Sequence, residues 1–210
     1  MTTDKNTIKE IFERFEIENP DPKSDLIANN EYTFCIAVLL SAQTTDKAVN
    51  KATKELFKIA DSPEKMLELG EEKLRDFIKI LGFHNTKSKN IILLSKMLVD
   101  KYNSKIPNNR EDLEKLPGIG RKSANVILNR VFKLDYIGVD THVLRVSNRI
   151  GLSDHKTPLE VERALLNVVP KEFHKYVSDW LVLHGRYICT AKKPNCSHCF
   201  LHDLCEYERR

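Results

Sequence analysis

Apolar residues recur with the spacing of an α-helix along most of the chain. Near the start, Ile8, Ile11, Phe12 and Phe15 share one helical face, and this pattern ends before two prolines. The same spacing predicts further helices over residues 32–41, 46–59, 64–69, 72–80, 87–102 and 112–116. Only residues 136–139 suggest extended backbone, and they are too few to found a sheet. The pattern therefore predicts an all-α fold.

Another helix start is marked by its capping residues. Thr157 and Glu160 have the spacing of a capping box, and Pro158 between them suits the first position of a helix. We therefore expect a helix to begin there, with its apolar face formed by Val161, Ala164, Leu165 and Val168.

Composition and charge narrow the class of protein. Apolar residues make up 41% of the 210, and 7 Gly and 8 Pro are too few for a collagenous or low-complexity chain. The longest nearly unbroken apolar run, 35–40, is much shorter than a membrane span. The first six residues lack an apolar signal segment, so a cytosolic, reducing compartment is expected.

The net charge is +4, and residues 117–133 hold four basic residues and no acidic one. This run suits a polyanion, although a solvated helix face would explain it too.

Four of the five cysteines lie close together near the end of the chain. Cys35 is interpreted as a small core residue, because it lies within an apolar helical run. The other four are Cys189, Cys196, Cys199 and Cys205. In a reducing compartment, disulfides are disfavoured and a metal site is the better interpretation. Zinc is a serious alternative, but one short Cys-x-x-Cys pair flanked by two wider loops is closer to several iron–sulfur arrangements.

A glycine-rich turn between two predicted helices is the second strong signal. The segment LPGIGRK (116–122) places Gly118 and Gly120 around one apolar residue, just before a helix. Such a turn leaves backbone N–H groups bare at the positive end of the helix dipole, where a phosphate can bind. A plain connector between helices has the same pattern, and the adjacent Arg121 and Lys122 favour the phosphate site.

Lys122 and Asp140 are the candidate catalytic pair. Arg121 and the helix dipole disfavour another positive charge at Lys122, which favours a neutral, nucleophilic amine. Asp140 comes at the start of another predicted helix and offers a carboxylate for proton transfer. It could equally be an N-cap, and both roles are compatible with one side chain.

Together these segments resemble the endonuclease III family, the DNA glycosylase/lyases of the helix-hairpin-helix superfamily. The resemblance covers nearly the whole chain and is carried by LLSAQTTD (39–46), LPGIGRK (116–122), VDTH (139–142), HGRY (184–187) and the four-cysteine segment ending in LCEY (204–207). It implies two helical lobes. One is a six-helix barrel over 25–134, and the other combines 1–24 with 135–210 and holds a [4Fe-4S] cluster in its loop 189–205.

The family resemblance also implies an activity. Oxidised pyrimidines are expected to be removed from duplex DNA through a Schiff base, followed by β-elimination 3′ to the abasic site. Lys122 would attack C1′, Asp140 would assist, and the four cysteines would be cluster ligands. The protein would act as a monomer in the bacterial cytoplasm, associated with the nucleoid through DNA. The predicted DNA contacts are Gln43, Phe83, Gly118, Gly120, Arg121, His142, Lys192 and Lys193.

Two of these residues are expected to fill the space left by an extruded nucleotide. A base within the duplex must leave the stack before an amine can reach its sugar. Gln43 matches the family residue that occupies the gap, and Phe83 matches the position of an apolar wedge. The family often has an aliphatic side chain there, so Phe83 is a departure, and a buried core aromatic is its alternative.

Two other functions are compatible with parts of this pattern. An adenine-mismatch glycosylase shares the hairpin and the cluster. It normally lacks lysine at the position of Lys122, differs around Gln43 and is expected to continue into a further C-terminal domain. A non-catalytic DNA-binding module with a structural metal is the alternative from another class.

Overall fold

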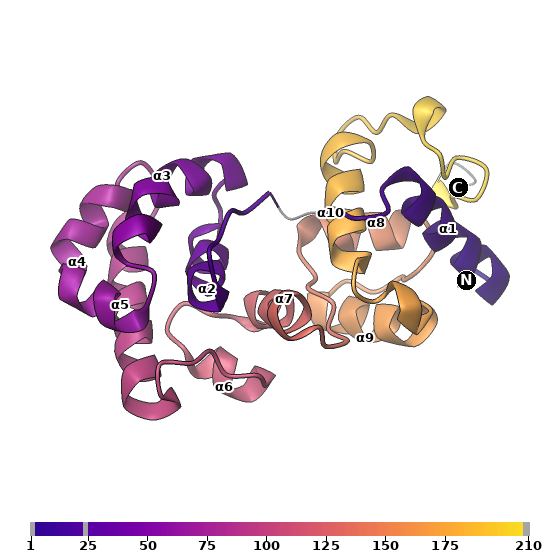
Figure 1. Ribbon diagram of the computed structural model, residues 1–210. Helices are drawn as coiled ribbons and strands as arrows, with labels where there is room; N and C mark the ends of the chain where they lie inside the picture. Colours follow the sequence, from indigo (N-terminus) through magenta and orange to yellow (C-terminus); the bar gives the residue numbers. More distant parts are fainter. Residues whose placement is uncertain (1–2, 23–24, 208–210) are drawn as a thin grey trace. The chain divides into compact units, whose positions relative to one another are not determined.

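The computed structural model describes residues 3–22 and 25–207 and is helical throughout (Figure 1). No strand occurs among these residues, which confirms the all-α prediction, and none of their helices is long and apolar enough to cross a membrane. The α-helices are α1 (Lys5–Glu18), α2 (Glu31–Leu40), α3 (Asp46–Ile59), α4 (Pro63–Ile78), α5 (His84–Tyr102), α6 (Arg110–Lys115), α7 (Arg121–Phe132), α8 (Thr141–Arg149), α9 (Pro158–Val168) and α10 (Val177–Tyr187). Two short 3₁₀ segments, Lys171–Phe173 and Cys196–His198, complete the set.

The helices are divided between two compact units. Unit 1 contains the described residues within Met1–Lys23 and Lys133–Arg210, and unit 2 those within Ser24–Phe132. Helices α2 to α7 therefore belong to unit 2, whereas α1 and α8 to α10 belong to unit 1. The sequence-based boundary after residue 24 falls at residues outside the described part of the chain.

Helix α2 runs through the core of unit 2. Asn30 and Thr33 form a capping box at its start, and nearly every residue from Tyr32 to Leu40 is buried. A helix that is apolar on all sides must be enclosed by its neighbours, and α2 contacts α3, α5 and α7. Cys35 is completely buried there, and burial raises the pKa of its thiol to about 12. The prediction that Cys35 is a core residue is confirmed.

Backbone conformation at two positions alters the predicted helix boundaries. The segments expected over 64–69 and 72–80 form one element, α4, with a non-helical break at Gly70 (φ 78°). Glycine adopts this left-handed conformation without steric cost, so the break lies where the apolar spacing is interrupted. Helix α5 begins at His84, before the predicted residue 87, because Phe83 caps it in a left-handed conformation (φ 58°) that the sequence does not signal.

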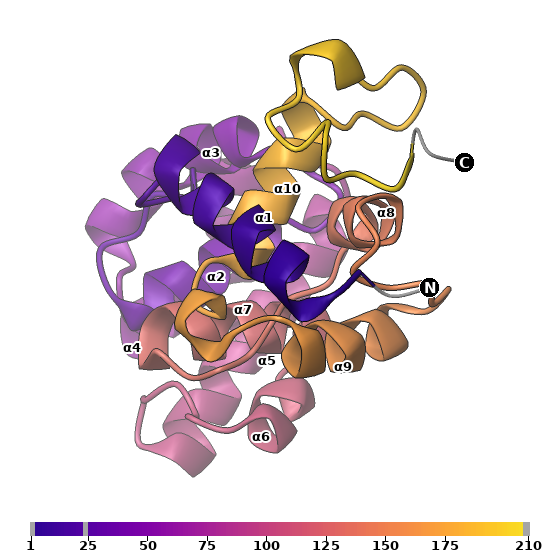
Figure 2. The ribbon, with the colours of Figure 1, turned by 90° about the vertical axis from the view of Figure 1, so that its right-hand side faces the viewer.

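The core of unit 1 is built around an aromatic cluster. Phe12 and Phe15 on α1 meet Trp180 on α10 with ring centroids 6.2 and 5.9 Å apart, and Phe12 stacks on Phe173 at 5.8 Å. The Trp180 indole N–H donates to the carbonyl of Asn19, just after α1, at 2.8 Å. Figure 2 shows α1 lying along this unit, near α9 and α10. These contacts bind the N-terminal helix to the C-terminal part of the chain.

Two helices of unit 1 approach unusually closely. A Cβ atom at Gly185 on α10 would lie 3.0 Å from Cβ of His142 and 3.1 Å from Cγ2 of Val146, both on α8. These distances are tighter than ordinary van der Waals contact, so a side chain at position 185 would require α8 or α10 to shift by a few tenths of an ångström. The predicted capping box of Thr157 and Glu160 is confirmed at the start of α9.

Replacing Phe12 with Ala is expected to destabilise unit 1 by about 3–5 kcal/mol, because it empties a completely buried site in the aromatic cluster. Trp180 is the one tryptophan of the chain, so its fluorescence during denaturant unfolding reports on this unit. The control is Ile17→Ala on the same helix, where the side chain is 82% exposed and the change should be within about 0.5 kcal/mol. An unchanged fluorescence midpoint for Phe12→Ala would contradict the packing described here.

Candidate active site and iron–sulfur centre

The glycine-rich turn joins α6 to α7 within unit 2. The Ile119 N–H donates to the carbonyl of Leu116 at 3.0 Å, and the side chain of Ile119 is buried. Gly118 has a φ of 83°, and a Cβ atom there would lie 2.9 Å from Cδ1 of Leu39 and 3.0 Å from Nδ2 of Asn90. The turn therefore requires glycine at this position for both its conformation and its packing.

Gly120 has different surroundings. A Cβ atom at Gly120 would meet nothing within 4 Å, so its backbone faces open space. The Ala124 N–H donates to the Gly120 carbonyl at 2.9 Å, and the N–H groups of Lys122 and Ser123 precede this bond in the first turn of α7. The side chain of Lys122 is exposed. An exposed amine thus lies in the first turn of α7, at the positive end of the helix dipole.

Asp140 is the N-cap of α8 in unit 1. Its Oδ1 accepts hydrogen bonds from the backbone N–H groups of His142 at 2.8 Å and Val143 at 3.0 Å. The capping role that the sequence left open is therefore present. Both bonds use the same carboxylate oxygen, so Oδ2 is left for another partner. His142 is half-buried, and its Nδ1 lies 3.3 Å from Nη2 of Arg145.

Gln43 and Phe83 are both exposed and both left-handed. Gln43 (φ 54°) lies in the loop between α2 and α3. Phe83 (φ 58°) directly precedes α5 and is 65% exposed. The alternative that Phe83 is a buried core aromatic is wrong. Positive φ at a residue other than glycine is uncommon and has to be supported by its surroundings.

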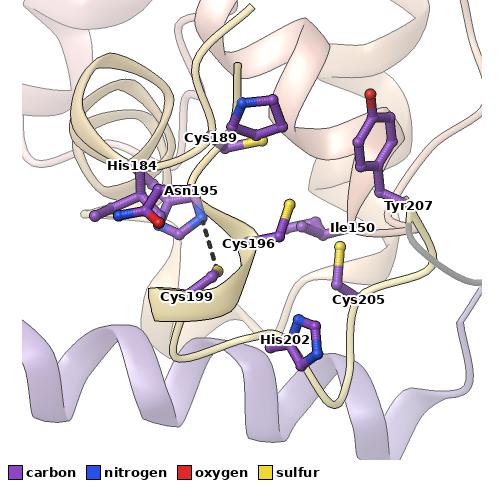
Figure 3. A pocket seen from close by; sticks show the side chains of 11 residues that line it. Ile150, His184, Cys189, Asn195, Cys196, Cys199, His202, Cys205 and Tyr207 are labelled. Atoms are coloured by element: carbon purple, nitrogen blue, oxygen red, sulfur yellow. Dashed lines mark hydrogen bonds between the residues drawn. The ribbon is translucent and has the colours of Figure 1, made fainter.

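The four C-terminal cysteines surround one pocket (Figure 3). None of the four forms a disulfide, and the pocket that they line has a volume of about 350 Å³, including its opening to solvent. No three of the described His, Cys, Asp or Glu side chains are arranged to hold a single metal ion, and the sulfurs are instead spread around the pocket. A [4Fe-4S] cluster takes one thiolate on each iron, so this donor set fits a cluster.

Two arginines of α8 hold the first part of the cysteine loop. Arg145 donates to the carbonyl of Cys189 at 3.1 and 3.2 Å and to that of Gly185 at 2.7 Å. Arg149 donates to the carbonyl of Thr190 at 2.7 Å, and its Nη1 lies 3.4 Å from Sγ of Cys189. Sequence reasoning missed both residues, although their i, i+4 spacing on one face of α8 was a usable signal.

His184, on α10, lines the same pocket. Its Nε2 is 3.5 Å from Sγ of Cys199, as the dashed line in Figure 3 shows. Burial lowers the pKa of the imidazole to about 4, so the ring is uncharged at neutral pH. From α1, Arg14 binds the same loop through the carboxylate of Asp203 at 2.6 and 2.8 Å and the carbonyl of Phe200 at 2.8 Å. The loop is therefore attached to three helices of unit 1.

The predicted site residues fall into two groups. Unit 2 holds Gln43, Phe83, Gly118, Gly120, Arg121 and Lys122, and unit 1 holds Asp140, His142, Lys192, Lys193 and the four cysteines. Lys192 and Lys193 are exposed on the loop between the first two cysteines, where the Lys193 carbonyl accepts from Oγ1 of Thr190 at 2.7 Å. Arg121 is half-buried at the start of α7.

Two family models match this chain. Residues 36–171 match the HhH-GPD superfamily of base excision DNA repair proteins, and residues 189–205 match the iron–sulfur binding domain of endonuclease III. The first match spans more than half of the chain and includes the glycine-rich turn. The second begins and ends on cysteines that line the pocket.

Individual relatives agree with these matches over nearly the full length. The endonuclease III of Rickettsia conorii is 50% identical over 95% of both chains, and that of Haemophilus influenzae is 48% identical over 96% of this chain and 95% of its own. A solved structure of a trapped endonuclease III–DNA covalent intermediate superimposes with a TM-score of 0.92 at 39% identity, covering 99% of this chain and 98% of the other. The chain belongs to the endonuclease III family of base excision repair DNA glycosylase/lyases, whose C-terminal segment binds a [4Fe-4S] cluster.

Proposed function

We propose that this enzyme removes oxidised pyrimidines from duplex DNA with Lys122 as its nucleophile and then cleaves the strand by β-elimination. The observation that carries the proposal is the exposed amine of Lys122 in the first turn of α7, directly after the glycine-rich turn. A 39% identical relative has been trapped in a covalent intermediate with DNA, as an amine nucleophile requires.

The proposed reaction needs one amine, that of Lys122, and one carboxylate, that of Asp140. The Lys122 nitrogen bonds to C1′ while the bond from C1′ to the base breaks, and the base leaves with the electron pair and takes up a proton. Opening of the sugar ring then gives a protonated Schiff base between Nζ and C1′. This cation acidifies the hydrogen on C2′, and its removal expels the 3′ phosphate as the C3′–O bond breaks.

Asp140 supports this proposal because its Oδ2 takes no part in capping α8. Oδ1 holds the first turn of α8, which fixes the orientation of the carboxylate. Oδ2 then serves as the acceptor that takes a proton from the attacking amine and stabilises the positive charge that develops on the sugar.

The remaining predicted contacts bind the DNA around the reacting nucleotide. The open backbone at Gly120, with the N–H groups that begin α7, suits a phosphate. Arg121, His142, Lys192 and Lys193 supply further polar or positive groups for the backbone. Gln43 and Phe83, both exposed, enter the gap that the extruded nucleotide leaves. Damaged bases are favoured because unstacking them costs less.

The cluster has a structural role in this proposal. Cys189, Cys196, Cys199 and Cys205 hold it, and when bound it cross-links the loop that carries Lys192 and Lys193. The bond-breaking steps use Lys122 and Asp140 only. We propose that the enzyme acts as a monomer on DNA in the bacterial nucleoid.

Lys122→Ala is expected to abolish strand cleavage of abasic-site DNA and release of an oxidised thymine from duplex DNA, because no other group forms the covalent bond. DNA affinity should fall only slightly, as measured by fluorescence anisotropy at several salt concentrations. If Lys122 were merely a phosphate contact, cleavage would persist, and the slope of log K against log salt would fall by about 0.9. Release of adenine from a mismatch by the wild-type enzyme, without release of the oxidised thymine, would contradict the substrate class.

Asp140→Asn and Asp140→Ala separate the two roles of this residue. Asparagine caps helices about as well as aspartate, so Asp140→Asn should keep the melting temperature while single-turnover base release slows by about 10²- to 10⁴-fold. Asp140→Ala should lose the same activity and also about 1 kcal/mol of stability. Wild-type rates in Asp140→Asn would show that the carboxylate is only a cap.

The two glycines of the turn should respond differently to alanine. Gly118→Ala is expected to cost about 1–3 kcal/mol in thermal unfolding, because the new Cβ meets Leu39 and the left-handed backbone is strained. Gly120→Ala should leave stability unchanged, since the Cβ enters open space, but weaken DNA binding by shielding the backbone from phosphate. Full DNA affinity in a stable Gly120→Ala variant would argue against the phosphate site.

A further inference from the structure

Lys87, on the first turns of α5, has a buried and fully bonded ammonium group. The residue is 6% exposed, and its Nζ donates to the carbonyl of Leu40 at 2.9 Å, the carbonyl of Ala42 at 3.0 Å and Oγ1 of Thr44 at 2.9 Å. A lysine ammonium has three donors, so all of them are used. Each acceptor is uncharged, and burial lowers the pKa of the amine.

The three acceptors surround Gln43 in the chain. Two precede it and one follows it, so the ammonium draws the ends of this short loop together around the exposed glutamine. Gln43 has a left-handed backbone, which is sterically unfavourable for a residue other than glycine unless its surroundings impose it. The bonds from Lys87 on both sides of Gln43 supply such a constraint.

The backbone of Lys87 is attached to the other candidate insertion residue. Its N–H donates to the carbonyl of Phe83 at 2.9 Å, which forms the first helical bond of α5. The backbone of Phe83 is also left-handed, and the residue is exposed. One residue is thus bonded, through its side chain and its main chain, to both segments that carry the expected gap-filling side chains.

We propose that Lys87 is a positioning residue that holds Gln43 and Phe83 ready to enter the DNA stack when the damaged nucleotide is extruded. This inference rests on the proposed function, because it assumes that these two side chains enter the gap. The alternative is that Lys87 only satisfies the last carbonyls of α2, which a lysine near a helix end can do. In that case stability would depend on Lys87, and the insertion step would not.

The test replaces Lys87 with Met, which keeps an unbranched side chain that is one atom shorter and removes the ammonium. Single-turnover release of an oxidised thymine should slow by about 10²-fold, as expected when a reacting arrangement is misplaced. With 2-aminopurine next to the lesion, the rise in fluorescence on unstacking should slow equally. Lys96→Met, which removes the same charge from an exposed position on α5, is the matched control and should leave both measurements unchanged.

A double-mutant cycle with Gln43→Ala shows whether Lys87 acts through Gln43. If it does, the double variant should be no slower than the slower single variant, because residues in one network are not additive. Rates that multiply would show an independent effect and overturn the inference. If Gln43→Ala and Phe83→Ala are both as fast as wild type, the proposed insertion itself fails. If they are slow but Lys87→Met is fast, only the role of Lys87 fails.

Thr44→Val is a second variant that tests the same proposal if Lys87→Met does not fold. It removes one acceptor of the ammonium, together with the 3.3 Å bond from Oγ1 of Thr44 to the Ala42 carbonyl, and preserves the lysine, the side-chain shape and the backbone bond from Thr44 N–H to the Ser41 carbonyl. We expect an about tenfold slower rise of 2-aminopurine fluorescence in a variant that remains folded, which corresponds to one hydrogen bond to a charged group. A wild-type rate in a folded Thr44→Val variant would contradict the proposal.

Discussion

The left-handed backbone of Gly118, pressed against Leu39 and Asn90, determines where α7 begins. Leu39 belongs to the buried helix α2, and Asn90 to α5, so the turn is seated on two helices of the unit 2 core. This packing places Lys122, in the first turn of α7, at the surface. Lys122 owes its exposure to this arrangement, since the opposite face of α7 carries the buried Ala124, Ile127 and Leu128.

The same two helices support the other segments of unit 2 that are proposed to contact DNA. The loop with Gln43 follows α2, and the turn with Phe83 precedes α5. Lys87 joins the two through four hydrogen bonds, three from its ammonium and one from its backbone. Residues predicted to fill the gap and to attack the sugar are therefore attached to one rigid core, which limits the conformational freedom lost when DNA binds.

Unit 1 depends on α8 in a comparable way. Asp140 caps its first turn, and Arg149 in its last turn binds the loop of the cysteines. The helix has nine residues, so the cluster loop and the candidate carboxylate are linked by a single short element. Gly185 allows α10 to pack closely on the same helix. In the proposed mechanism, a cluster that stabilises the loop thereby helps to fix the carboxylate and takes no part in the bond-breaking steps.

Local signals in the sequence predicted the helices and the cysteine cluster, because apolar spacing, capping residues and cysteine spacing are all short-range. The start of α5 was missed, since nothing in Phe83 itself announces a left-handed cap. Lys87, Arg145 and Arg149 were missed for another reason. Their partners lie 40 or more positions away in the chain, and a lysine or arginine within a helix most often faces solvent. The sequence predicted capping as one of two roles for Asp140. Only the structure shows that both capping bonds use Oδ1, which leaves Oδ2 for another partner.

The most direct test of the central claim is to identify the amine that bonds to the sugar. The enzyme is incubated with abasic-site DNA in the presence of borohydride, which reduces a Schiff base to a stable amine, and the product is digested and mapped by mass spectrometry. If Lys122 is the nucleophile, a sugar-derived mass increase is expected on the peptide that contains Lys122 and on no other peptide. A modified amine elsewhere in the chain, or active enzyme that yields no adduct, would contradict it.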